Sequence, residues 1–186
     1  MAYKEGIGEN GQLPLHKLKK VEPKEKLYRV AANSYLRMRK EAKKQGVNLE
    51  LNDAYRICGR KGDYSERNCS MGFTQWCAWE KYQAGVGNLA SDPTTSEGCK
   101  SNHGYGLAID VKNTSGARDW IRENGEKYGW WWSGGTFSQI EDWHFDYDKE
   151  RDIIRKKKIK SNLIYASIFV VFLGVGVGLF YATRKK

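Results

Sequence analysis

The stretch Ser101–Asp110, SNHGYGLAID, places a histidine, two glycines and an aspartate around the apolar run Leu-Ala-Ile. Two interpretations are open. The stretch can be a glycine-rich turn that leads into a buried strand, or His103 and Asp110 can be two ligands of one metal ion. Residues seven apart on an unbroken strand face opposite ways. Convergence therefore requires a bend, for which Gly104 and Gly106 supply the backbone freedom.

A second stretch, EDWHFDY at 141–147, places Glu141 three residues before His144. Two neutral imidazoles and one carboxylate suit the first coordination shell of zinc and leave one position for water. Either stretch alone is better explained by a loop histidine beside an acid, but the two together favour a metal site. The remaining histidine, His16, lies in a lysine-rich segment, where we expect it to be exposed.

The two stretches match the patterns SxHxxGxAxD and ExWH, and together they resemble the M15 family of zinc D,D-carboxypeptidases and L,D-endopeptidases. This family includes VanY- and VanX-like enzymes and phage endolysins. The upstream segment DAYR, 53–56, resembles the family's Gly-Tyr-Arg segment, with Ala54 in place of glycine. The resemblance covers residues 25–147. It implies an α+β fold with a small antiparallel sheet and flanking helices, shared with the hedgehog signalling domain.

The resemblance also implies a role for each matching residue. These are His103, Asp110 and His144 as ligands of Zn²⁺, Glu141 as general base, Arg56 as the cation that stabilises the oxyanion, and Ser101 as a substrate-binding residue that supports the site.

The implied reaction is hydrolysis of peptidoglycan stem-peptide bonds that involve D-amino acids, as a D-Ala-D-Ala carboxypeptidase or an L-Ala-D-Glu type endopeptidase. The alternative is a non-catalytic, membrane-anchored structural or binding protein on the same scaffold. Retention of all three ligand types and of Glu141 favours the enzyme.

The segment 163–182, LIYASIFVVFLGVGVGLFYA, contains no charged residue. As a helix, twenty residues span roughly 30 Å, the thickness of the hydrocarbon core of a bilayer. We therefore expect a transmembrane helix here, with Gly174 and Gly178 as a GxxxG motif for helix–helix association. The chain thus divides into a polar arm 1–22, a peptidase domain 23–150, a basic linker 151–162, the membrane helix 163–182 and a basic tail 183–186.

The formal net charge of +10 indicates an anionic partner. In the linker, six lysine and arginine residues stand against Asp152 alone, so half of the net charge lies beside the expected membrane helix. Anionic lipid explains this cluster more simply than DNA or RNA does, and no nucleic-acid partner is expected.

The N-terminus has no apolar stretch typical of a signal peptide, and the basic linker predicts a cytoplasmic domain, away from peptidoglycan. Three interpretations resolve this conflict: an inverted orientation, since three basic residues also follow the segment, a phage lysis protein, or a phage virion protein. We favour the last two and expect a single-pass protein of a phage virion membrane or of the host inner membrane.

The expected secondary structure mixes helices and strands with short connections. We expect helices over 23–46, 70–84 and 117–128, strands over 47–51, 106–111 and 141–147, and an aromatic turn over 130–135. Two local questions stay open. The four cysteines can form two disulfides or remain buried thiols. The run Trp130–Trp132 can be a stacking platform for substrate or part of the core.

Overall fold

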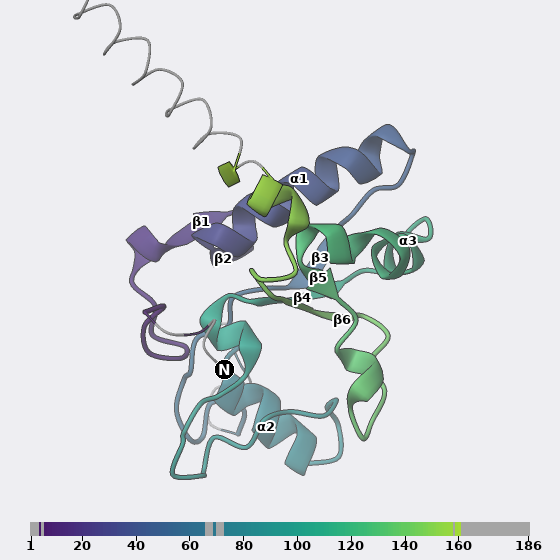
Figure 1. The fold of residues 1–186 in the computed structure, drawn as a ribbon. Helices are drawn as coiled ribbons and strands as arrows, with labels where there is room; N and C mark the ends of the chain where they lie inside the picture. The colour runs from purple at the N-terminus through teal and green to yellow at the C-terminus, as the bar shows by residue number, and fades with distance from the viewer. Residues whose placement is uncertain (1–3, 5, 66–68, 70–72, 158, 161–186) are drawn as a thin grey trace, which may run out of the picture. The chain divides into compact units, whose positions relative to one another are not determined.

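The computed structural model describes residues 4, 6–65, 69, 73–157 and 159–160. Residues 1–152 form one compact unit, shown in Figure 1, and residues 153–186 form a second. Besides short 3-10 helices, the first unit contains three α-helices and six β-strands among the described residues: β1 (Leu18–Lys20), β2 (Lys26–Tyr28), α1 (Arg29–Lys44), β3 (Leu51–Asp53), α2 (Gln75–Gln83), β4 (Ala108–Val111), α3 (Ala117–Asn124), β5 (Trp130–Trp131) and β6 (His144–Tyr147).

The central element is a four-stranded antiparallel sheet in the order β3-β4-β6-β5. The two inner strands, β4 and β6, are almost entirely buried, including the polar residues His144 and Asp146 of β6. In Figure 1, α1 and α3 lie above this sheet and α2 lies below it. The predicted α+β class with a small antiparallel sheet is confirmed. In the register of β4 and β6, Asp110 lies directly opposite His144.

Helix α1 follows from its apolar spacing. Ala31, Tyr35, Met38 and Ala42 recur every three or four residues and are fully buried. The helix ends before Gly46, whose φ of +79° is the left-handed conformation that glycine adopts without cost. The predicted end of this helix is confirmed.

The predicted start of this helix at Pro23 is wrong. Residues 26–28 form β2, which pairs with β1 in an antiparallel hairpin, and α1 begins at Arg29. Leu27 is fully buried, and the Tyr28 N–H donates to the Gly106 carbonyl. These long-range contacts outweigh the local helical pattern. The segment 1–22 is correspondingly more than an irregular arm, because it contains β1 and buries Ile7.

Other elements also differ from the expectations: α2 begins only at Gln75, β6 begins only at His144, and α3 ends at Asn124. The paired part of the predicted strand 47–51 begins only at Leu51 and continues to Asp53. The predicted aromatic turn contains an edge strand, β5, in which Trp130 is fully buried and packs against Tyr35 and Tyr147. Trp130 is therefore a core residue, which answers the question left open for that position.

Two disulfides link the segments around the cleft described below: Cys58–Cys99 and Cys69–Cys77. They resolve the choice between disulfides and free thiols. The expected transmembrane helix 163–182 and the tail 183–186 lie outside the described residues. Within the part of the chain that is described, no helix has the length and apolarity needed to cross a bilayer.

Candidate metal centre and active site

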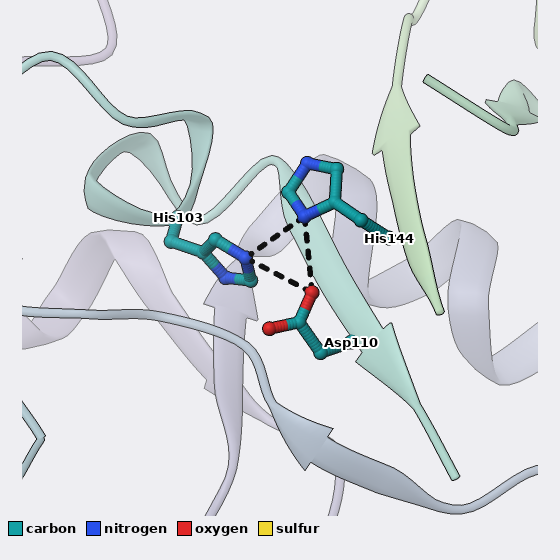
Figure 2. Close-up of side chains that lie close together, drawn as sticks. All are labelled: His103, Asp110 and His144. Carbon is teal, nitrogen blue, oxygen red and sulfur yellow. Dashed lines mark hydrogen bonds and ion pairs between the residues drawn. The ribbon is translucent and has the colours of Figure 1, made fainter. Parts of the chain in front are cut away.

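Three side chains that are far apart in the sequence converge beside the sheet: His103, Asp110 and His144 (Figure 2). Asp110 and His144 come from neighbouring positions on β4 and β6, so both side chains leave the same face of the sheet. His103 comes from the 3-10 turn Asn102–Tyr105, which directly precedes β4. The predicted metal group is therefore assembled by the pairing of two strands and one turn.

The bend between His103 and Asp110 depends on Gly106. Its φ of +62° ends the 3-10 turn in the left-handed region and redirects the chain into β4. Gly104 serves a different purpose, since a Cβ at this position would lie 1.9 Å from the Asn10 amide oxygen. The two glycines of the motif are thus required for a turn and for a close approach, respectively.

The ligand atoms have the spacing of a tetrahedral site. His103 Nε2 lies 3.3 Å from His144 Nδ1 and 3.3 Å from Asp110 Oδ1, and the last two atoms are 3.0 Å apart. Tetrahedral ligands at about 2.0–2.1 Å from zinc are about 3.3 Å from one another. The donor set and its spacing therefore fit zinc.

Each imidazole ring is oriented by an acceptor near the ring nitrogen that faces away from the centre. His103 Nδ1 lies 2.6 Å from the Ala54 carbonyl oxygen, and because that oxygen can only accept, Nδ1 carries the proton and Nε2 presents its lone pair to the centre. On the other ring, His144 Nε2 lies 3.3 Å from Asp146 Oδ1, which leaves Nδ1 facing the centre. Such outer partners are typical of zinc-bound histidines.

The charges of the group favour a cation. Burial opposes protonation of His144, but the carboxylates of Asp110 and Asp146 outweigh it and raise the pKa of this imidazole to about 10. Burial likewise disfavours charge on Asp110, yet His103 and His144 hold the pKa of that carboxyl well below its usual range. The carboxylates thus attract positive charge to a buried position.

Glu141 lies beside this group. Its Oε2 atom is 3.9 Å from His144 Nδ1, and a turn at 142–143 separates the two residues, as their spacing predicts. The backbone of Glu141 is fixed because its carbonyl accepts from the Trp132 indole at 2.9 Å. Burial raises the pKa of the Glu141 carboxyl, in part against the opposing effect of His144. A carboxyl group in this environment is suited to proton transfer.

Arg56 faces the metal group from the segment after β3. Its guanidinium forms an ion pair with Asp53, and Nη2 lies 3.7 Å from Asp110 Oδ2. The guanidinium also stacks over the ring of Phe73, with its central carbon 4.8 Å from the ring centre. Arg56 is therefore a positioned, mostly buried cation at the edge of the metal group.

Ser101 lines the same cleft but acts on the backbone. Its Oγ accepts from the His103 N–H at 3.3 Å, which caps the 3-10 turn that carries this ligand. All six residues predicted for the site thus line one cleft of about 660 Å³. Its wall also includes the loop segment 86–91.

Two contributions were not assigned from the sequence. Asp146 was visible two residues after His144, and strand alternation, which places both on one face, is the signal that could have identified it. The Ala54 carbonyl had no such signal, because a backbone contact is independent of the side chain. Asp142, the nearest other acid, instead pairs with Arg118 at 2.8 Å and is half-exposed.

No family model and no curated protein matches the chain. Several solved structures do. VanY, a vancomycin-resistance D,D-pentapeptidase solved as a mutant in complex with Zn(II), is 15% identical; the match covers 76% of this chain and 86% of VanY, with a TM-score of 0.46. VanXYg, a D,D-dipeptidase in complex with a D-Ala-D-Ala phosphinate analogue, is 16% identical over 83% of this chain and 62% of its own, with a TM-score of 0.49.

DacB from Streptococcus pneumoniae is 22% identical over 83% of this chain and 80% of its own, with a TM-score of 0.45. These similarities concern the path of the chain, and the functional conclusion for this chain depends on the side chains described above.

Proposed function

We propose that this chain is a zinc-dependent peptidase that hydrolyses peptidoglycan stem-peptide bonds involving D-amino acids. The observation that carries the proposal is the convergence of His103, Asp110 and His144 at the spacing of a tetrahedral site, with Glu141 beside them in one cleft. A buried carboxyl group beside a metal group favours a catalytic role over a purely structural one.

His103 Nε2, Asp110 Oδ1 and His144 Nδ1 would hold the zinc ion. When bound, zinc polarises a carbonyl group and makes water a stronger acid. The Glu141 carboxylate accepts a proton from the attacking water and delivers it to the departing amine. The Arg56 guanidinium donates hydrogen bonds to the oxygen on which negative charge develops, and its ion pair with Asp53 keeps it in place.

The substrate class is supported by the motifs and by what the similar structures contain. VanXYg was solved with an analogue of D-Ala-D-Ala, and the structure of LdcB, an L,D-carboxypeptidase, concerns peptidoglycan recognition. The cleft of about 660 Å³ is large enough to hold a short peptide, because ligand pockets usually measure about 300–1,000 Å³.

The decisive experiment is incubation of the purified full chain with peptidoglycan, with and without a chelator, followed by mass analysis of the released peptides. We expect soluble peptides to be released only when zinc is present. Glu141→Ala should retain one zinc per chain and release no product. Zinc binding by the unaltered chain without any product would instead favour the non-catalytic alternative, and undiminished hydrolysis by Glu141→Ala would refute the general base.

We further propose that residues 163–182 anchor the protein in a phage virion membrane or the host inner membrane. The uncharged length of this segment and the basic residues on both sides support the proposal. The full chain should float with vesicles containing anionic lipid at high salt, whereas a chain truncated after residue 162 should not. Equal flotation of both chains would show that residues 163–182 do not anchor the protein.

A further inference from the structure

Two buried side-chain amides hold the backbone of Ser101, at the start of the turn that carries His103. The Ser101 N–H donates to Gln75 Oε1 at 3.1 Å, Gln75 Nε2 donates to Asn10 Oδ1 at 2.8 Å, and Asn10 Nδ2 donates to the Ser101 carbonyl at 2.8 Å. Asn10 is 7% exposed and Gln75 is 2% exposed. We call this closed set of hydrogen bonds the amide bridge.

The direction of the amide bridge is fixed by the backbone. A peptide N–H can only donate, and a peptide carbonyl can only accept. Gln75 therefore turns its oxygen to the Ser101 N–H, which leaves its nitrogen facing Asn10, and Asn10 turns its nitrogen to the Ser101 carbonyl. Because each amide has one orientation, replacing either NH2 group by an oxygen places two acceptors against each other.

The turn that carries His103 packs directly on the amide bridge. A Cβ at Gly104 would lie 1.9 Å from Asn10 Oδ1 and 2.4 Å from Gln75 Nε2. The Gly104 carbonyl also accepts from the N–H of Gly11, the neighbour of Asn10, at 2.7 Å. The backbone is therefore held on both sides of His103, at Ser101 and at Gly104.

The amide bridge is also joined to the segment that carries Arg56. The backbone N–H of Gln75, the first residue of α2, donates to the Ile57 carbonyl at 3.0 Å. The Arg56 N–H donates in turn to the His103 carbonyl at 3.1 Å. The backbone of the ligand turn and the backbone of the Arg56 segment are thus fixed relative to the same side chain, Gln75.

We infer that Asn10 and Gln75 are positioning residues for the metal group, which fix the turn so that His103 Nε2 keeps its place in the ligand set. Metal ligands have to be held within about 0.5 Å of their productive geometry. Buried amide networks whose hydrogen bonds are all made specify one such arrangement. The inference rests on the metal group of the proposed function and not on its reaction.

This role extends the site beyond the residues that the motifs cover. Asn10 precedes the range 25–147 over which the sequence resembles a known family, and it lies in the segment 1–22 that was expected to be an irregular arm. Asn10 contacts no metal ligand through its side chain and acts only through the backbone of Ser101 and the side chain of Gln75. Its effect on the metal is therefore one of position.

The first test reverses one amide at a time in the full chain. Asn10→Asp and Gln75→Glu keep the shape of each side chain but place an oxygen against the Ser101 carbonyl and against Asn10 Oδ1, respectively. Each should lower zinc affinity about 10-fold in competition with a chromogenic chelator. Asn33→Asp, the same change on the exposed face of α1, is the matched control and should bind zinc as the unaltered chain does. Unchanged affinity in both bridge variants would overturn the inference.

The second test separates position from stability. Asn10→Ala removes one amide without burying a charge. Ser34→Ala removes a buried hydrogen bond to the Tyr128 carbonyl on α1, a helix that contributes no residue to the cleft. Both variants should have a lower Tm, but only Asn10→Ala should also lose zinc affinity, about 10-fold. Equal zinc affinities, or loss of the fold in Asn10→Ala alone, would show that the amide stabilises the domain and does not position the ligand.

Kinetics give a third measurement. With a stem pentapeptide and saturating zinc, Asn10→Ala should lose about 10-fold in kcat with KM within about twofold, because the amide bridge holds His103 and Arg56 and not the substrate. A change in KM alone would contradict the inference. If the unaltered chain binds zinc and cleaves nothing, the proposed function fails, while the zinc affinities of the variants still decide the inference.

Discussion

At the scale of single residues, His144 is the ligand with the most constrained position. It lies between Asp110 and Asp146, one carboxylate near each ring nitrogen, at 3.0 and 3.3 Å. The first carboxylate shares the metal group, while the second orients the ring from outside it. Removing the second should therefore weaken metal binding without removing a ligand.

Asp146→Asn should lower zinc affinity about 10–100-fold, because the amide keeps the shape of the side chain but loses the charge that fixes the His144 tautomer. Competition with a chromogenic chelator measures this directly. Asp142→Asn is the matched control, since Asp142 pairs with Arg118 and does not contact the ligand rings. Equal affinities for both variants would show that Asp146 does not position the ligand.

Glu25 should make stability depend on pH. Burial raises the pKa of its carboxyl, and the neighbouring charges of Asp53 and Glu22 raise it further. A raised carboxyl pKa means that the folded state binds the proton more tightly than the unfolded state does. The stabilisation that the protonated Glu25 contributes is therefore complete at pH values below the pKa of the unfolded state. It is lost as pH rises through the pKa of the folded state, and it remains absent at higher pH.

Glu25→Gln should accordingly raise Tm at pH 7 by about 1–2 °C, the effect of about 0.5 kcal/mol, and change it little at about pH 4. Thermal unfolding at both pH values, with the exposed Glu123→Gln on α3 as control, checks this. A lower Tm at pH 7 would contradict the direction of the pKa shift.

At the scale of elements, the turn that carries His103 depends on the conformation of Gly106. A Cβ at this position would lie 2.6 Å from the Tyr28 backbone nitrogen, in addition to the cost of a positive φ. Gly116 has a similar φ of +70° but no heavy atom within 4 Å of its Cβ position. Alanine substitutions at the two glycines therefore distinguish the cost of backbone strain from the cost of steric overlap.

Gly106→Ala should destabilise the chain by about 2–4 kcal/mol, the sum of strain and overlap, and Gly116→Ala by about 1 kcal/mol from strain alone. Urea unfolding gives both values. Similar losses for the two variants would mean that β2 moves away from the turn without cost.

The disulfides should differ in their contribution for a related reason. Cys58–Cys99 closes a separation of 41 residues, and Cys69–Cys77 closes 8. Loop-closure entropy predicts about 4 kcal/mol for the first and about 2–3 kcal/mol for the second. Replacing each pair by serines and measuring urea unfolding tests this order. A larger loss for the short loop would show that local contacts, and not chain entropy, dominate.

The same contrast between local and distant effects explains which elements could be predicted. The end of α1 at Gly46 was predictable because the stop depends on one glycine and the apolar spacing before it. The β1–β2 hairpin was not, since each strand has only three residues and is lysine-rich. The pairing of β2 depends on burial of Leu27 and on a contact with Gly106, which is distant in the sequence.

At the scale of the whole molecule, the metal group was predictable because its residue types and spacing are specific to one chemistry. The backbone partner of His103, the Ala54 carbonyl, was not predictable. The Ala54 carbonyl reaches His103 only because the segment after β3 lies beside the turn. Such features depend on how separate segments pack, which local patterns do not record.

The most direct test of the account is the position of zinc in crystals of the full chain or its complex with zinc, measured as an anomalous difference at the zinc absorption edge. We expect one peak at about 2.0–2.2 Å from His103 Nε2, Asp110 Oδ1 and His144 Nδ1. A peak at any other position, or no peak from crystals grown with excess zinc, would contradict it.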